Sequence, residues 1–67
     1  MTESTNKGTI LIIDDHERSR SLYRTLFMRE GYKVLEAETG ERGLELLKST
    51  KPDVIILDLH QIGRAHV

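Results

Sequence analysis

The sequence predicts an α/β fold built on a parallel β-sheet. Short apolar runs rich in β-branched residues alternate with longer segments in which apolar residues recur at helical spacing. Glycine and proline stand at the junctions between these segments. Strands that alternate with helices along a chain are typical of a parallel sheet joined by right-handed crossovers. The expected order of elements is therefore β-α-β-α-β.

The first strand is expected at Thr9–Asp14, a β-branched run without alternation, which suits a strand covered on both faces. The next segment, His16–Glu30, has apolar residues on one helical face and charges on the other. Gly31 is a suitable residue to end this helix. The residues expected in the core are Leu22, Leu26 and Phe27. The arginines expected on a solvated face are Arg18, Arg20, Arg24 and Arg29.

The second half of the chain repeats the alternation. A second strand is expected at Tyr32–Ala37, and Thr39 is a suitable N-cap for a helix over Gly40–Thr50. Pro52 breaks that helix, and Asp53–Leu59 is a strongly apolar third strand. The residues expected on or near the buried side of the second helix are Gly43, Leu44, Leu46 and Leu47.

Composition excludes several classes of protein. The 67 residues contain no cysteine, which rules out disulfides and thiolate metal sites. Ten basic and 11 acidic residues give a net charge of -1 and no basic field for nucleic acid. The longest apolar runs, Ile10–Ile13 and Val54–Leu57, are far shorter than the roughly 20 residues of a membrane span. We expect a cytoplasmic protein in which this segment contacts neither nucleic acid nor membrane. The polar Met1–Gly8 is expected to be a disordered lead-in.

Acidic residues end two of the expected strands. Asp14 and Asp15 close the first strand, and Asp58 closes the third. The third strand can pair with the second or with the first. If it pairs with the first, the sheet order is 2-1-3, as in doubly wound flavodoxin-like sheets, and the helices lie on opposite faces. Ligands bind at the carboxyl ends of strands beside such a switch point, where three carboxylates would then meet.

Three close carboxylates repel one another, and a hard cation relieves that repulsion. Mg²⁺ is usually held by one or two carboxylates together with water and phosphate oxygens. The cluster therefore suits Mg²⁺-assisted phosphoryl transfer in which a carboxylate is the nucleophile. The structural alternative is that Asp15 only caps the first helix. His16 is expected to be an exposed residue of the first helical turn, with a metal-ligand role left open.

Four stretches occur in the order and spacing of a known family: Thr9–Asp15, Gly31–Val34, Ala37–Leu44 and Lys51–Leu59. On these stretches, residues 9–60 resemble a receiver domain of two-component signalling. The resemblance implies a truncated flavodoxin-like doubly wound parallel sheet with strand order 2-1-3.

The resemblance also implies the roles of the acidic residues. Asp58 would accept a phosphoryl group from the phosphohistidine of a sensor histidine kinase or phosphotransfer protein. Asp15 would bind Mg²⁺ directly and Asp14 mostly through water, with Asp58 and the backbone carbonyl of His60 completing the metal site. Such a domain is a phosphoacceptor regulatory domain and not an enzyme, although family members assist their own phosphorylation and dephosphorylation.

Two alternatives come from other functional classes. Phosphohydrolases with an aspartyl nucleophile carry Asp-x-Asp after the first strand, whereas this chain has Asp14-Asp15-His16 there. The other alternative is a non-catalytic fragment or pseudo-receiver that acts by protein contacts alone. The complete acidic trio argues against a pseudo-receiver.

The resemblance covers only the first half of a receiver domain. We expect the chain to lack the Ser/Thr and Lys of later strands, so that the fragment itself is inactive or impaired. Val54–Leu57 would then form an apolar sheet edge prone to aggregation. Gln61–Val67 departs from the family and resembles a translated sequencing adapter. We expect this segment to be a non-native tail.

Overall fold

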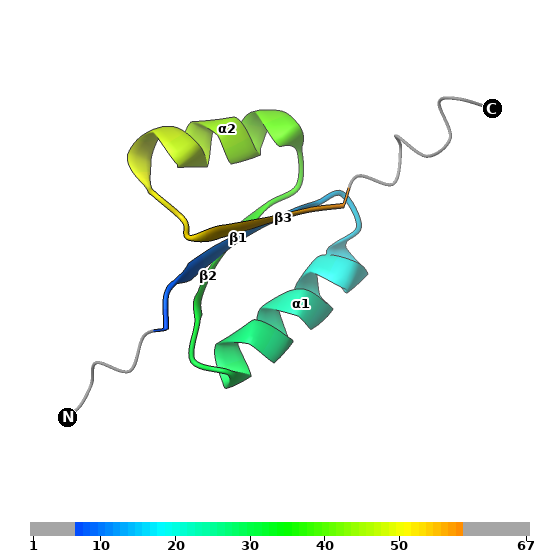
Figure 1. The fold of residues 1–67 in the computed structure, drawn as a ribbon. Helices are drawn as coiled ribbons and strands as arrows, with labels where there is room; N and C mark the ends of the chain where they lie inside the picture. The colour runs from blue at the N-terminus through cyan, green and yellow to red at the C-terminus, as the bar shows by residue number, and fades with distance from the viewer. Residues whose placement is uncertain (1–6, 59–67) are drawn as a thin grey trace.

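A computed structural model describes residues 7–58 of the chain. Its elements are β1 (Thr9–Asp14), α1 (Glu17–Arg29), β2 (Lys33–Ala37), α2 (Gly40–Ser49) and β3 (Val54–Asp58). The strands form one parallel sheet in the order β2-β1-β3. Helix α1 covers one face of this sheet and α2 covers the other (Figure 1). The predicted fold class and strand order are confirmed.

Predicted and observed bounds differ little. The first strand is as predicted, and within the described residues the other elements differ from their predicted bounds by one residue at one or both ends. Of the predicted lead-in, residues 1–6 lie outside the described residues, whereas the Lys7 N–H donates to the Gly31 carbonyl. Leu59, His60 and the tail at 61–67 also lie outside them. Neither of the helices between residues 7 and 58 is long and apolar enough to cross a membrane.

The central strand β1 carries the core. Its four isoleucine and leucine residues are no more than 6% exposed, as expected for a strand covered on both faces. Leu11 and Ile13 form a buried cluster with Ala37 of β2. The half-buried residues that pack against this cluster are Leu35, Leu46 and Leu47.

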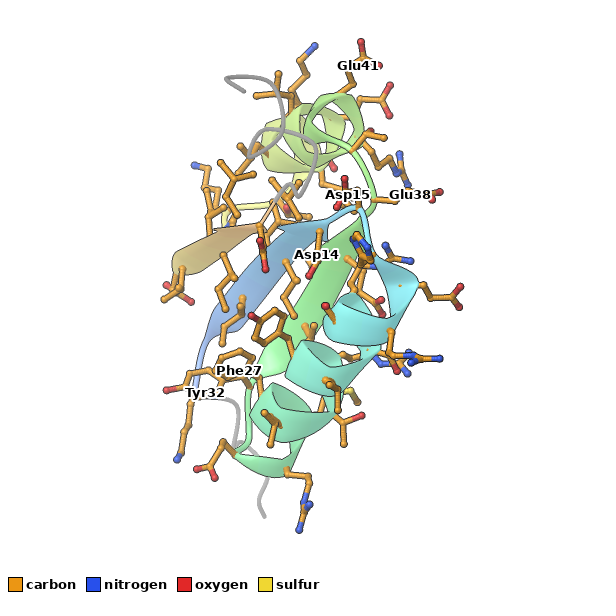
Figure 2. The ribbon with its side chains drawn as sticks, turned by 90° about the vertical axis from the view of Figure 1, so that its right-hand side faces the viewer. Asp14, Asp15, Phe27, Tyr32, Glu38 and Glu41 are labelled. Atoms are coloured by element: carbon orange, nitrogen blue, oxygen red, sulfur yellow. The ribbon has the colours of Figure 1, made fainter. Side chains whose placement is uncertain are left out.

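The end of α1 fixes the direction in which the chain enters β2. Gly31 has a φ of 99°, a left-handed conformation that glycine adopts without strain. Its N–H donates to the Met28 carbonyl at 3.1 Å, and the Tyr32 N–H donates to the Phe27 carbonyl at 3.0 Å. These two bonds make a Schellman motif. The Phe27 and Tyr32 rings meet edge to face with centroids 6.0 Å apart, which closes the motif with an apolar contact (Figure 2).

The start of α2 follows the predicted capping. Thr39 is the N-cap residue, and its side-chain Oγ1 accepts a hydrogen bond from the Arg42 N–H at 3.0 Å. Gly43, in the middle of the helix, is buried against Ile13 of β1. The absence of a side chain at position 43 lets α2 lie close to the sheet.

Three residues expected in or near the core are exposed instead. Leu22 and Leu26 of α1 are 62% and 55% exposed, and Leu44 of α2 is 62% exposed. In α1 the half-buried row at four-residue spacing is Ser19, Tyr23 and Phe27. Leu22 and Leu26 lie on the flank of that row, so hydrophobic periodicity identified the apolar side of the helix but not the row that contacts the sheet.

Candidate functional site

The turn between β1 and α1 is built around Asp14. This residue ends β1 and is fully buried. Its carboxylate Oδ1 accepts a hydrogen bond from the His16 N–H at 2.8 Å, which is the pattern of an Asx turn. The N-cap residue of α1 is His16, without a side-chain capping bond. The alternative in which Asp15 serves as the N-cap of the helix is therefore excluded.

Asp15 and His16 extend the cluster at the carboxyl end of β1. Asp15 Oδ1 lies 3.3 Å from His16 Nδ1, and the two side chains are 15% and 58% exposed. His16 is thus exposed, as predicted. One ligand atom each from Asp14, Asp15 and His16 lie within 4.8 Å of one another. Figure 2 shows Asp14 and Asp15 together where β1 leaves the sheet.

Asp58 reaches the same edge from the neighbouring strand. It is the last residue of β3 and is half-buried, and its Cα is the register partner of Asp14. Neighbouring strands lie roughly 4.8 Å apart, and residues in register point to the same face of the sheet. Strand order therefore brings the backbone of Asp58 next to that of Asp14, although its carboxylate is not one of the ligand atoms grouped within 4.8 Å. His60, the fourth predicted ligand, lies outside the described residues.

The donor set fits a divalent cation. Carboxylate oxygens are hard ligands of the kind that Mg²⁺ prefers. Asp14 and Asp15 offer theirs within one group, and Asp58 stands in register with Asp14 on the neighbouring strand. Close carboxylates also raise the free energy of the site until a cation neutralises them. The exposed imidazole of His16 adds a nitrogen donor, which suits first-row transition metals better than Mg²⁺.

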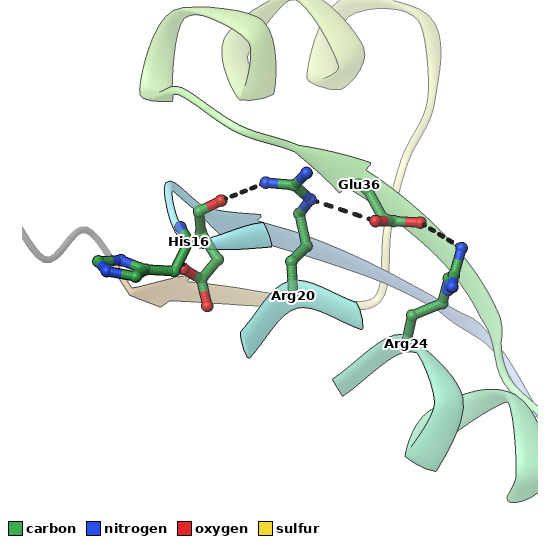
Figure 3. Close-up of polar contacts among 5 residues, drawn as sticks. His16, Arg20, Arg24 and Glu36 are labelled. Carbon is green, nitrogen blue, oxygen red and sulfur yellow. Dashed lines mark hydrogen bonds and ion pairs between the residues drawn. The ribbon is translucent and has the colours of Figure 1, made fainter. Parts of the chain in front are cut away.

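Arg20 was predicted to lie on the solvated face of α1, but in the structure it contacts the β1–α1 turn. Its side chain is only 15% exposed. Nη1 donates to the backbone carbonyl of Asp14 at 2.7 Å, and Nε donates to Oε1 of Glu36 at 3.2 Å (Figure 3). The prediction was wrong because the first turns of α1 run back along the end of β1. Sequence spacing pairs Arg20 with Arg24 on one face of α1, but it contains no signal for their shared partner on β2.

The chain matches one protein-family model and several curated proteins. The model described as "Response regulator receiver domain" matches residues 10–62. The chain is similar to the KDP operon transcriptional regulatory protein KdpE of Escherichia coli, with 46% identity over 50 residues, which cover 75% of this chain and 22% of that protein.

Two further relatives have names that indicate other roles. The nitrate/nitrite response regulator protein NarL of Escherichia coli is 46% identical over 58 residues, 84% of this chain and 27% of that protein. The sporulation initiation phosphotransferase F of Bacillus subtilis is 36% identical over 50 residues, 75% of this chain and 40% of that protein. The chain thus spans between a fifth and two fifths of these relatives. No solved structure matches the chain significantly.

Proposed function

The chain belongs to the response regulator receiver domain family, and from this membership we propose that it takes part in phosphorelay signalling with Asp58 as the phosphoryl acceptor. The observation that carries the proposal is the register of the sheet, which aligns Asp58 with Asp14 at the carboxyl ends of β3 and β1. In an open parallel sheet, ligands bind at this edge beside the point where strand order reverses.

In the proposed reaction, a carboxylate oxygen of Asp58 attacks the phosphorus of a phosphohistidine. An oxygen–phosphorus bond forms while the nitrogen–phosphorus bond breaks. The electron pair of the broken bond stays on the imidazole nitrogen, which then takes up a proton. The product on this chain is an aspartyl phosphate. Asp58 is half-buried at the end of its strand, so part of the residue remains accessible to solvent.

The acidic residues would also hold Mg²⁺. Asp15 would bind it directly, Asp14 mostly through water, and Asp58 with the backbone carbonyl of His60 would complete the set. When bound, the cation neutralises charge on the transferring phosphoryl group. The chain's own contribution is to hold the carboxylates in place, and the bond from the His16 N–H to Asp14 Oδ1 supports that role.

The proposed partner is a sensor histidine kinase or a phosphotransfer protein, and the proposed location is the cytoplasm. The names of the relatives, a nitrate/nitrite response regulator and a sporulation initiation phosphotransferase among them, support a place in such relays. Receiver domains are regulatory, so we propose that this segment is a phosphoacceptor and not an enzyme with a substrate of its own.

The proposal predicts Mg²⁺-dependent phosphorylation at Asp58. The 67-residue chain is incubated with a small phosphodonor such as acetyl phosphate, with and without MgCl₂, and labelling is followed by intact-mass spectrometry. We expect slow labelling that requires Mg²⁺ and is lost in Asp58→Asn. The matched control is Asp53→Asn, at the residue that directly precedes β3. The Asp53 side chain accepts a hydrogen bond from the Thr9 N–H at 2.8 Å, and Asn still offers an oxygen there.

The two variants separate the possible outcomes. If Asp58→Asn is still labelled, the assignment of Asp58 as the acceptor is wrong. If Asp53→Asn loses labelling to the same extent, the loss reflects removal of a carboxylate in general. If the unchanged chain takes no label, the proposal that this chain accepts a phosphoryl group at Asp58 fails.

A further inference from the structure

We propose that Arg20 is a positioning residue for the acidic site. It joins the backbone carbonyl of Asp14 to Glu36 on β2 and thereby holds the β1–α1 turn that presents Asp14 and Asp15. The inference rests on the proposed function in one respect: its effect on cation affinity requires that the acidic edge binds a cation.

Arg20 makes two hydrogen bonds, and its side chain is largely shielded from solvent. Nη1 lies 2.7 Å from the Asp14 carbonyl oxygen and Nε lies 3.2 Å from Glu36 Oε1, so one guanidinium bridges two strands (Figure 3). The side chains of Arg20 and Glu36 are 15% and 31% exposed. A charged donor in such a site makes a stronger hydrogen bond than a neutral one.

Glu36 is itself held from a second side. Its other oxygen, Oε2, lies 3.3 Å from Nη1 of Arg24, one helical turn beyond Arg20. Glu36 is the register partner of Ile12, which is fully buried, so its backbone is anchored in the sheet. Because the backbone of Glu36 is anchored in this way, its carboxylate can orient the Arg20 guanidinium even when the contact with Arg24 is lost.

Hydrogen bonds hold both the side-chain carboxylate and the backbone carbonyl of Asp14. The His16 N–H holds the carboxylate at 2.8 Å, and Arg20 holds the backbone carbonyl at 2.7 Å. The carbonyl belongs to the peptide bond that leads into Asp15. Fixing that peptide plane sets the position of the Asp15 Cα atom, from which the Asp15 side chain starts. Arg20 thus acts on the cation site through the backbone and does not touch the cation.

The positive charge of Arg20 has the opposite effect on cation affinity. A cation near three carboxylates lowers their attraction for Mg²⁺, so removal of the charge alone would tighten binding. Removal of a positioning contact weakens binding, by roughly tenfold if it resembles other outer-shell changes at metal sites. The sign of the change in affinity therefore distinguishes positioning from electrostatics.

The test uses the ¹⁵N-labelled 67-residue chain and follows its amide resonances by NMR during titration with MgCl₂. We expect Arg20→Gln to weaken Mg²⁺ binding about tenfold, although it removes a positive charge. The matched control is Arg24→Gln, which removes the same charge from the same Glu36 without a bond to Asp14. The Mg²⁺ affinity of Arg24→Gln should equal that of the unchanged chain or be slightly higher. Arg20→Lys keeps the positive charge but lacks the planar guanidinium that donates to two acceptors at once. We expect its Mg²⁺ affinity to lie between those of Arg20→Gln and the unchanged chain.

A second readout needs no metal. In the free chain, the His16 amide is protected by its bond to Asp14 Oδ1. We expect this amide to exchange with solvent faster in Arg20→Gln than in Arg24→Gln, while core amides of β1 exchange alike in both variants. A general loss of stability would instead speed exchange throughout the strand.

The outcomes separate the two proposals. Tighter Mg²⁺ binding in Arg20→Gln, or unfolding of that variant alone, would overturn the positioning role. If the unchanged chain shows no Mg²⁺-dependent shifts, the proposed cation site fails. The exchange rate of the His16 amide then decides the role of Arg20 by itself.

Discussion

At the scale of single residues, the site depends on how Asp14 is tolerated in the interior. A fully buried carboxylate is unfavourable in free energy unless hydrogen bonds or a cation compensate it. The His16 N–H supplies one such bond to the side chain. The neighbouring peptide carbonyl is held by Arg20. Asp14 therefore combines two roles, as the last residue of the central strand and as an anchor of the acidic cluster.

His16 is the residue through which metal preference can be tested. Its imidazole nitrogen lies 3.3 Å from Asp15 Oδ1, within the group of potential ligand atoms. We expect His16→Ala to weaken Mn²⁺ binding by roughly tenfold and to leave Mg²⁺ binding nearly unchanged, because imidazole suits first-row transition metals. Line broadening of amides by Mn²⁺ and shift titration with Mg²⁺ measure the two affinities.

The control for His16 is the neighbouring exposed acid, Glu17. Glu17 is not one of the grouped ligand residues, so Glu17→Ala removes only a negative charge. It should weaken the binding of Mn²⁺ and of Mg²⁺ slightly and equally. Equal losses for both metals in His16→Ala would mean that the imidazole does not coordinate.

At the scale of elements, the approach of α2 to the sheet depends on Gly43. A Cβ at this position would overlap the side chain of Ile13, which is 6% exposed and belongs to the core cluster. The same helix starts with Gly40, where a Cβ would meet nothing within 4 Å. The two glycines therefore offer a matched pair of positions in one element.

We expect Gly43→Ala to lower the free energy of unfolding by roughly 1 kcal/mol. Overpacking of a core costs about 1–3 kcal/mol, and the higher helix propensity of alanine offsets up to about 1 kcal/mol of that loss. Gly40→Ala should be neutral or stabilising, since only the propensity term applies there. Urea unfolding followed by circular dichroism measures both. Equal stabilisation by the two substitutions would show that Ile13 moves aside freely.

At the scale of the whole molecule, the described residues leave much apolar surface uncovered. No strand among residues 7–58 pairs with the outer edge of β3. The large apolar residues that are 47% or more exposed are Leu22, Leu26, Met28, Leu44, Val54, Ile55 and Leu57. An open edge with apolar side chains is a template for pairing with another chain. The expected apolar edge over Val54–Leu57 therefore has a structural basis.

We expect Ile55→Lys to reduce self-association of the chain, since a lysine on an edge strand opposes edge-to-edge pairing. A dissociation constant about tenfold higher corresponds to about 1.4 kcal/mol. Sedimentation velocity over a concentration series measures the change. The control is Leu44→Lys, which places the same charge on α2, away from the open edge. If both variants reduce association equally, general hydrophobicity and not strand pairing is responsible.

The sequence by itself determined the elements and the identity of the acidic residues. These predictions rest on local signals. The spacing of apolar residues indicates each helix or strand, Gly31 marks the end of α1, and Thr39 marks the start of α2. The placement of Asp14, Asp15 and Asp58 at strand ends followed from the same local patterns. Strand order followed from the family resemblance, because local patterns allow β3 to pair with either neighbour.

Only the tertiary structure decided which side chains meet. Arg20 and Glu36 lie on different elements and 16 residues apart, so no local pattern pairs them. The exposure of Leu22 and Leu26 depends on which row of α1 touches the sheet, which the docking of the helix sets. The alignment of Asp58 with Asp14 likewise exists only once β3 has joined β1. Long-range packing makes these contacts, and periodicity along the chain contains no information on them.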